Sequence, residues 1–472
     1  MTKKVTFTLD GKALEAREGQ TVLEAATDAG IMIPHYCWHR SLGNPGNCRM
    51  CLVEVEGTPK PQVSCRLPAR EGLVVKSLSP AAKRAQTSAL ELHLVDHPLD
   101  CPVCDQSGEC GLQDYYMGIG RYVSVLREDK AHAKKRQVLG PHIVLDQERC
   151  ILCTRCTRFV AQISKSHELG IFGRGHNEAV DLVPGRTLDN PYSGNLADIC
   201  PVGALTDRDF RFQVRVWYLD ETESICPGCS RGCPISAHTS TQRPWHNKGR
   251  RLARLKPRVL DWLCDEGRYG FSDFDSDRLG RLTAPLSEVR SALQTHRDDL
   301  AVVASGSLSN EDWKAFKSLF VDKLKVKRFL FTPEPDQVGS EDELLRRREK
   351  VPNLEGGRAL GFGTEIKSLT WESLGQDIAE GRVRSLYVVD RDPAKVLGEK
   401  LLHKLELLIY QGPRMGKTGG LARYRLPATD WLEENGHFTN FQGKIQEYRQ
   451  ALKPLGDARP DWKIFADLEA GL

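Results

Sequence analysis

The stretch Cys150-Ile-Leu-Cys153-Thr-Arg-Cys156, followed far downstream by Cys200-Pro201, decides how the chain is interpreted. It belongs to a set of 15 cysteines, all within the first 264 of 472 residues. No apolar run approaches the roughly 18 residues that cross a bilayer, and the start of the chain has no signal-peptide core, so we expect a cytoplasmic protein with reduced thiols. An odd number of thiols cannot all pair as disulfides, which makes metal ligation their expected use.

The composition is that of an ordinary globular protein, with 40% hydrophobic and 28% charged residues. Lys and Arg number 67 and Asp and Glu 63, a net charge of +4, which is too small a bias over this length to indicate nucleic-acid binding. At about 100 to 200 residues per domain, the length predicts roughly three or more folding units.

The quoted stretch predicts one iron–sulfur cluster. In bacterial ferredoxins a C-x2-C-x2-C run binds three corners of a [4Fe–4S] cube, and the Cys-Pro of the other half of the protein supplies the fourth. Here the Cys-Pro pair has no C-x2-C-x2-C run of its own. We therefore predict a ferredoxin-like unit with a single cluster, for which zinc is a poor alternative. The predicted ligands are Cys150, Cys153, Cys156 and Cys200.

Another set of four cysteines follows what is predicted to be a small N-terminal sheet. Residues 5–9 alternate as a strand, residues 13–16 can return as its hairpin partner, and residues 21–29 have helical spacing with Thr21 as N-cap. The cysteines have 10, 2 and 13 residues between them, which resembles the plant-type [2Fe–2S] pattern with a longer first spacing. A zinc ribbon is the alternative, but zinc ligands usually come as two short C-x2-C pairs. The predicted ligands are Cys37, Cys48, Cys51 and Cys65.

The ligand count points to one histidine. Fifteen thiols fill three sites of four and leave three over, and His97, four residues before Cys101, is placed to complete a fourth site. This spacing suits one helical turn, and residues 89–95 have the apolar pattern of that helix. Imidazole in place of a thiolate makes a cluster less negative, which on charge alone raises its reduction potential. The predicted ligands are His97, Cys101, Cys104 and Cys110.

The last group is Cys226-Pro-Gly-Cys229-Ser-Arg-Gly-Cys233, closed by Cys264 within Trp262-Leu-Cys-Asp-Glu-Gly-Arg268. This pattern resembles the cluster-binding module at the head of molybdopterin oxidoreductases. With the other three motifs before it in this order, the chain resembles the large iron–sulfur subunit (the G-type, 75-kDa homologue) of bacterial proton-translocating NADH:quinone oxidoreductase, respiratory complex I. The resemblance is strong over residues 1–275 and continues weakly to the end of the chain.

This resemblance implies an α+β multidomain fold in five parts. They are an N-terminal β-grasp [2Fe–2S] ferredoxin-like domain (1–80), a His/Cys3-ligated [4Fe–4S] domain (81–120), a ferredoxin-like [4Fe–4S] domain (121–217), a molybdopterin-oxidoreductase-type [4Fe–4S] domain (218–275) and a shortened α/β molybdopterin-oxidoreductase-like domain (276–472). The implied cofactors are one [2Fe–2S] and three [4Fe–4S] clusters, the last held by Cys226, Cys229, Cys233 and Cys264. We expect no molybdenum cofactor, because no cysteine follows and the remaining chain is short.

The resemblance also implies a function. In the family the clusters carry single electrons from a flavin-bearing NADH-oxidising subunit toward quinone, alongside other iron–sulfur subunits and a membrane arm. The chain would be an enzyme subunit without a catalytic residue, NADH site or quinone site of its own, peripheral on the cytoplasmic side of the inner membrane. The cluster matching Cys226 to Cys264 is remote from the electron path in the family, so we expect that site to serve stability. We expect neither nucleic acid nor a directly bound nucleotide.

The tail is predicted to be one α/β domain. Residues 341–350 are densely charged and are expected to form a solvated helix, with a docking surface as the alternative. Residues 411–418 resemble a phosphate-binding loop, but Gln411 stands where that motif needs Gly and Pro413 removes one backbone N–H, so we expect no working nucleotide loop. Strand-like segments separate helical stretches; they are residues 300–304, 326–331, 385–389 and 405–410.

Two other classes of protein compete with this interpretation. The first is the electron-input subunit of an NAD-linked hydrogenase or formate dehydrogenase, whose motifs look similar; the neighbouring genes would discriminate. The second is a zinc-binding scaffold protein, which a colourless purified chain would favour.

Overall fold

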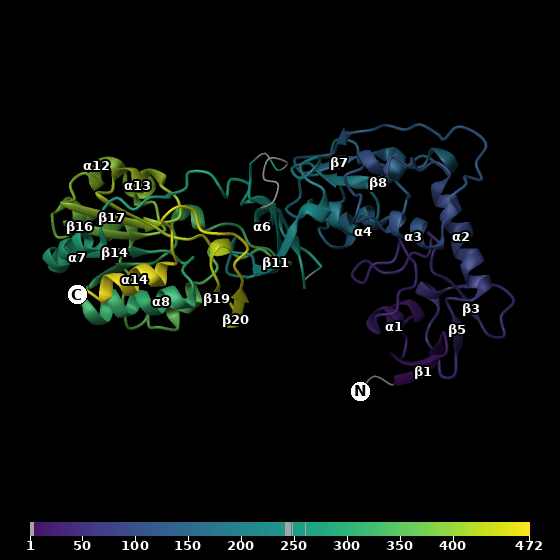
Figure 1. Ribbon diagram of the computed structural model, residues 1–472, viewed down its shortest axis with the longest axis horizontal. Coiled ribbons are helices and arrows are strands. Elements are labelled where there is room, and N and C mark those ends of the chain that lie inside the picture. The colour runs from purple at the N-terminus through teal and green to yellow at the C-terminus, as the bar shows by residue number, and fades with distance from the viewer. Residues whose placement is uncertain (1–3, 241–246, 248, 260) are drawn as a thin grey trace. The chain divides into compact units, whose positions relative to one another are not determined.

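The computed structural model describes residues 4–240, 247, 249–259 and 261–472 (Figure 1). The chain divides into two compact units, Met1–Trp217 and Tyr218–Leu472. Three sheets lie in the first unit, and a five-stranded parallel sheet dominates the second. No helix among the described residues is long and apolar enough to span a membrane.

The first unit begins with the predicted hairpin. Strand β1 (Lys4–Leu9) pairs antiparallel with β2 (Lys12–Arg17), and β1 then pairs in parallel with β5 (Val74–Lys76). Strands β3 (Leu52–Val55) and β4 (Gln62–Val63) complete a sheet of order β2-β1-β5-β3-β4.

The predicted first helix is confirmed as α1 (Val22–Asp28). Thr21 caps it: its hydroxyl accepts from the Glu24 N–H at 3.3 Å, and the Glu24 carboxylate accepts from the Thr21 N–H at 2.9 Å. This reciprocal capping box fixes where the helix begins.

The remainder of the first unit consists of short elements joined by long loops. The helices are α2 (Pro80–Leu94), α3 (Gly111–Ile119), α4 (Arg155–Gln162) and α5 (Asn195–Ile199). The strands are β6 (Gln137–Val138), β7 (Ile143–Leu145), β8 (Leu169–Phe172), β9 (Ala179–Leu182) and β10 (Leu205–Asp207).

The prediction that one helical turn carries His97 and Cys101 is wrong. Helix α2 covers the predicted segment but ends at Leu94, and residues 97–100 have no regular structure. Pro98 explains the difference, because a proline disfavours the helical conformation of the residue before it. Cys101 instead opens a short 3-10 turn, Cys101–Val103.

The second unit combines a small antiparallel sheet with the predicted α/β domain. Strands β11 (Asp220–Ile225), β12 (Pro234–Thr239) and β13 (Leu252–Pro257) form the antiparallel sheet, and α6 (Asp265–Tyr269) follows Cys264. The parallel sheet has the order β15 (Arg328–Leu330), β14 (Leu300–Ala304), β16 (Ser385–Val389), β17 (Leu407–Gly412) and β18 (Tyr424–Pro427). All four predicted strands are confirmed, two with the predicted ends and two displaced by one or two residues.

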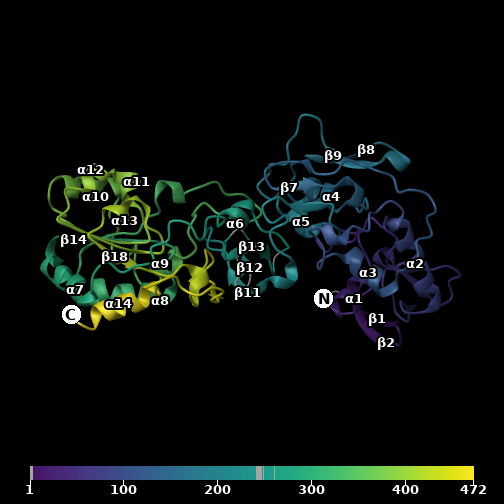
Figure 2. The ribbon, with the colours of Figure 1, turned by 45° about the horizontal axis from the view of Figure 1, so that its top comes forward.

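Helices cover both faces of the parallel sheet (Figure 2). One face carries α7 (Leu286–Thr295), α8 (Asn310–Phe316) and α14 (Asp461–Glu469). The other carries α10 (Trp371–Ala379), α11 (Pro393–Leu397), α12 (Glu399–Leu402) and α13 (Gly416–Leu421). Helix α9 (Leu354–Arg358) and the hairpin of β19 (Gly436–Thr439) with β20 (Ile445–Tyr448) lie outside the sheet order.

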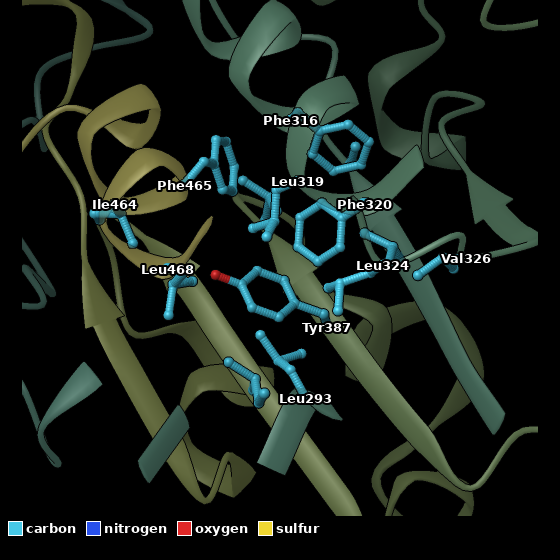
Figure 3. Close-up of a cluster of buried hydrophobic side chains, with 14 of the residues drawn as sticks. Leu293, Phe316, Leu319, Phe320, Leu324, Val326, Tyr387, Ile464, Phe465 and Leu468 are labelled. Atoms are coloured by element: carbon cyan, nitrogen blue, oxygen red, sulfur yellow. The ribbon is translucent and has the colours of Figure 1, made fainter. Parts of the chain in front are cut away.

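Alternating side chains of the strands divide between two cores. Val302, Tyr387 and Ile409 are cross-strand neighbours that face α7, α8 and α14. Figure 3 shows the Tyr387 ring in this core beside Phe320, with ring centroids 4.9 Å apart. Val388, one residue further along β16, belongs to the opposite core. The domain is therefore a parallel sheet with helices on both faces, which is the α/β arrangement that the alternation of strands and helices predicted.

Residues 341–350 do not form the predicted helix. The Asp342 carboxylate accepts the backbone N–H groups of Leu344, Leu345 and Arg346 at 2.9 to 3.1 Å, and this local turn replaces helical hydrogen bonds. Only four of its ten residues are exposed, so the segment is solvated only in part. Lys350 is paired with Glu266 at 2.6 Å and its side chain is 14% exposed.

Candidate metal centres

The first group surrounds the loop that leads into β3. All four cysteines are buried, and the Cys37 N–H lies 3.4 Å from the Cys48 sulfur. A hydrogen bond from the Cys48 thiol, helped by the backbone N–H groups of Gly46 and Asn47, lowers the pKa of Cys37 to about 5. The same relation to Cys65 lowers the pKa of Cys51 to about 7. Thiolates, the form that binds iron, are thus favoured at two of the four positions.

The second group lies between α2 and α3. His97 is 9% exposed, and burial lowers its pKa to about 4, so its imidazole is neutral at pH 7, the form that binds a metal. Its Nδ1 is buried with no hydrogen-bond partner among the described residues. Burial raises the pKa of Cys104, and that of Cys110 to about 11. A buried thiol with a raised pKa requires a metal or a cation to become a thiolate.

The third group encloses a small cavity whose other lining is mostly apolar, with Thr154 and Arg155 as its polar members. Its four cysteines come from the loop before α4, from the first turn of α4 and from the end of α5. Leu152 and Thr154, between the first three, have φ of 49° and 65°. This left-handed backbone is uncommon for residues other than Gly and turns the loop tightly around the cavity. The apolar lining consists of Leu145, Ile151, Val180, Val202, Ala204 and Leu205.

The fourth group lies in the second unit, where the β11–β12 connection meets the start of α6. The Gly267 N–H lies 3.3 Å from the Cys264 sulfur. A Cβ at Gly267 would lie 3.0 Å from the Cys226 sulfur, so the Gly of the quoted Trp262 to Arg268 motif keeps room between two cysteines. The connection is held by the hairpin region near the C-terminus, because the Phe441 N–H donates to the Ser230 carbonyl at 2.8 Å.

In the part of the chain that the structure describes, no three Cys, His, Asp or Glu side chains are arranged to hold one metal ion. An iron–sulfur cluster requires a wider arrangement of ligands than a single ion, because its four ligands are divided among two or four iron atoms. All 15 cysteines are free thiols, and 13 of them are buried.

The first three groups contact one another, which sequence reasoning did not find. The Pro201 carbonyl, directly after Cys200, accepts from the Gly111 N–H at 3.1 Å and lies 3.8 Å from the Cys110 sulfur. A Cβ at Gly203 would lie 2.2 Å from the Cys104 sulfur. The peptide that follows the last cysteine of the third group therefore packs against the second group.

The first group also meets its neighbours. The Asn47 amide donates to the Leu152 carbonyl at 3.1 Å. Tyr36 is fully buried, and burial, with smaller effects of Tyr115, Cys110 and Cys48, raises its pKa. In the sequence, the Gly and Pro of the Cys-Pro-x-Gly run were the available signals of these contacts between groups. The residues that they contact lie too far away in the sequence to be identified from it.

A cavity of about 610 Å³ in the second unit lies at the carboxyl ends of the parallel strands. Ser307, Asp390 and Asp430 enter it from the loops after β14, β16 and β18. This is the edge at which open α/β sheets bind ligands. Burial raises the pKa of Asp390 to about 7, and that residue also has a φ of 47°. The acidic lining consists of Glu266, Asp312, Asp390, Asp430, Glu434 and Asp461, against Lys350 and Arg414.

The loop that resembles a phosphate site holds carboxylates of the protein itself. The Gly416 N–H donates to Asp277 at 2.9 Å, and the N–H groups of Lys417 and Thr418 donate to Asp392 at 3.1 and 2.8 Å. Two aspartates thus occupy the donors that a phosphate would need.

Comparison with known proteins agrees with this geometry. Four family profiles match in chain order: "2Fe-2S iron-sulfur cluster binding domain" at residues 2–80, "NADH-ubiquinone oxidoreductase-G iron-sulfur binding region" at 86–123, "NADH-quinone oxidoreductase subunit 3, ferredoxin-like domain" at 140–206 and "Molybdopterin oxidoreductase" at 336–470. The G-type subunit of the NADH-quinone oxidoreductase of Rickettsia conorii is 36% identical over 338 residues, covering 68% of this chain and 49% of the relative. Its counterpart in Streptomyces coelicolor is 42% identical over 288 residues, covering 60% and 33%.

The chain is a homologue of the G-type subunit of NADH-quinone oxidoreductase. This G-type homologue spans about half, or less, of the length of the curated relatives it matches. A chain of an NAD+-reducing [NiFe]-hydrogenase is also similar, at 38% identity over 45% of this chain and 91% of that chain, with a TM-score of 0.41. The matched profiles confirm the expected α+β multidomain fold class, with [2Fe–2S] and [4Fe–4S] binding domains.

Proposed function

We propose that the G-type homologue is an electron-transfer subunit of an NADH:quinone oxidoreductase. It relays single electrons from the flavin of an NADH-oxidising partner toward quinone and works beside further iron–sulfur subunits and a membrane arm. The observation that carries this proposal is the match of three iron–sulfur profiles, in chain order, over residues 2–206. The four predicted ligand groups, formed by the fifteen cysteines and the buried, neutral imidazole of His97, support it.

Each group is assigned one cluster on this proposal. The first binds [2Fe–2S] through Cys37, Cys48, Cys51 and Cys65. The other three bind [4Fe–4S] through His97, Cys101, Cys104 and Cys110; through Cys150, Cys153, Cys156 and Cys200; and through Cys226, Cys229, Cys233 and Cys264. When bound, these clusters supply one-electron chemistry.

The chain's own residues supply the environment for that chemistry. The apolar walls around the third group exclude water, and the neutral imidazole of His97 is ready to bind iron without losing a proton. In the first group the backbone N–H groups of Gly46 and Asn47 stabilise the Cys37 thiolate. Hydrogen bonds to ligand sulfurs and exclusion of solvent are among the factors that set cluster potentials.

The molybdopterin profile implies a molybdenum cofactor, and the residues present do not fit one. The cofactor is anionic, whereas six carboxylates line the cavity and two more cap the neighbouring loop. Residues 265–472, which include the α/β domain, contain no cysteine that could bind molybdenum. We infer that the α/β domain carries no molybdenum cofactor.

Metal analysis tests the proposal. Protein purified without oxygen should contain about 14 iron and 14 sulfide per chain, from one binuclear and three cubane clusters. Low-temperature EPR of the reduced protein should then resolve four cluster signals. Stoichiometric zinc with little iron would contradict the assignment. The proteins that co-purify with the chain separate the proposed complex from a hydrogenase or formate dehydrogenase.

A further inference from the structure

Arg155, the first residue of α4, connects the ligand loops of two groups. Its Nη2 donates to the Trp38 carbonyl at 2.7 Å, one residue after Cys37. Its Nη1 donates to the Ile199 carbonyl at 3.1 Å, one residue before Cys200. One guanidinium therefore lies between a ligand of the first group and a ligand of the third.

Arg158, one turn further along α4, holds the same first-group loop. Its Nη1 donates to the carbonyls of Leu42 and Gly43 at 2.5 and 3.2 Å, and its Nη2 donates to the Cys37 carbonyl. Its Nε donates to the Thr154 hydroxyl at 3.1 Å. Both arginines are half-buried.

Neither guanidinium forms an ion pair with a carboxylate in the ranges that the structure describes; the hydrogen bonds given above all end on neutral oxygens. Arg149 of the same unit is different, because Asp100 and Asp146 lie 2.6 and 3.5 Å from its guanidinium. Charges withdrawn from water are normally paired with an opposite charge. The two unpaired cations next to eight thiols point to a negative charge at those thiols.

Arg155 shows where that charge lies. The residue lines the cavity of the third group, and its Nε is buried without a hydrogen-bond partner among the described residues. One N–H is thus left for an acceptor that the protein does not provide. A cluster held by four thiolates is anionic and becomes more negative by one unit when it is reduced, so a fixed cation beside it favours the reduced form.

We propose that Arg155 and Arg158 are positioning residues that act as the shared counter-charge of the clusters in the first and third groups and raise the reduction potentials of both. This inference rests on the proposed function. Arg155 serves both clusters because it lies between Cys37 and Cys200. Arg158 acts chiefly on the first group, since three of its four acceptors are carbonyls of that loop.

The test is a redox titration followed by low-temperature EPR, on the full chain purified without oxygen. In Arg155→Gln the ratio of reduced to oxidised cluster, at a fixed ambient potential, should fall at least tenfold for both clusters, which is 59 mV for a one-electron couple. Arg158→Gln should produce this fall for the first group. Arg155→Lys keeps the charge and should keep both ratios near those of the wild type. Arg84→Gln removes the same charge from an exposed position on α2 and should change neither ratio.

Unchanged ratios in both glutamine variants with full iron content would overturn the inference. A shift in Arg155→Lys as large as in Arg155→Gln would also overturn it, because hydrogen-bond geometry and not charge would then be responsible. If Arg155→Gln loses a cluster, rescue of that cluster by Arg155→Lys supports the counter-charge and failure of the rescue contradicts it. Wild-type protein without iron would contradict the proposed function, whereas loaded protein with unshifted potentials contradicts only the role of the arginines.

Discussion

Gly203 offers the sharpest test of how the second and third groups are joined. Its φ is not in the left-handed region, so alanine suits the backbone, and the closest obstacle is the Cys104 sulfur at 2.2 Å from the new Cβ. Ordinary van der Waals contact begins at 3.4 Å, so the sulfur has to move by about 1.2 Å. Metal–ligand distances tolerate only about 0.2 Å. We therefore expect Gly203→Ala to lose the second cluster while the ligands of the other three remain.

The assay is iron and sulfide content combined with EPR of the reduced protein. Iron should fall from about 14 to about 10 per chain, with one [4Fe–4S] signal lost. Gly118→Ala is the matched control, because nothing lies within 4 Å of a Cβ there and the substitution is inside helix α3. Full iron content and an unchanged second-cluster signal in Gly203→Ala would refute the reasoning.

Three further predictions follow from the other sites. Cys229→Ser should reduce the yield of assembled complex more than the turnover of each complex, whereas Cys153→Ser should stop turnover even where assembly survives. The measurement is the NADH:quinone rate normalised to assembled complex. A well-assembled Cys229 variant without electron transfer would contradict the stabilising role of the fourth group. Asp390 keeps its proton to about pH 7 when folded but loses it above its ordinary pKa of 3.8 when unfolded, so its destabilising effect develops as the pH rises through 3.8 and is complete above pH 7. Asp390→Asn should raise the melting temperature more at pH 8 than at pH 4, by an amount equivalent to at most about 4 kcal/mol; an equal rise at both pH values would count against this linkage. Native protein should contain no stoichiometric molybdenum, and an ATP titration should give the same result for wild type and Lys417→Ala; bound molybdenum, or ATP binding that the substitution removes, would be the contrary result.

Local patterns in the sequence predicted the local structure well. The β1–β2 hairpin, the Thr21 cap and the four predicted strands of the parallel sheet depend on neighbouring residues, and all are confirmed. The two wrong helices failed for local reasons that were also present in the sequence. Pro98 ends the helical run before His97, and Asp342 offers its own carboxylate to the backbone of the charged segment.

The contacts between the groups could not be predicted in this way. Pro201 meets Cys110 across 91 residues, and Arg155 meets Trp38 across 117. Spacing rules assign ligands within one loop, but they carry no information on which loops fold against each other. The grouping of cysteines by motif remains a prediction about ligands, and the proximity of the first three groups is a property of the folded unit.

The interlocked loops of the first unit also bear on how the protein matures. Arg155 and Arg158 join the ligand loop of the first group to that of the third through hydrogen bonds, and the Pro201 carbonyl contacts the second group at Cys110. A cluster can enter one of these sites only while the adjoining loops are open, so loading one site affects access to the next. We expect clusters to be inserted in an order, with partly loaded chains accumulating when iron is limiting; equal depletion of all signals during iron starvation would contradict such an order. The chain would then be assembled around its cofactors, and its folding pathway would be part of its biogenesis.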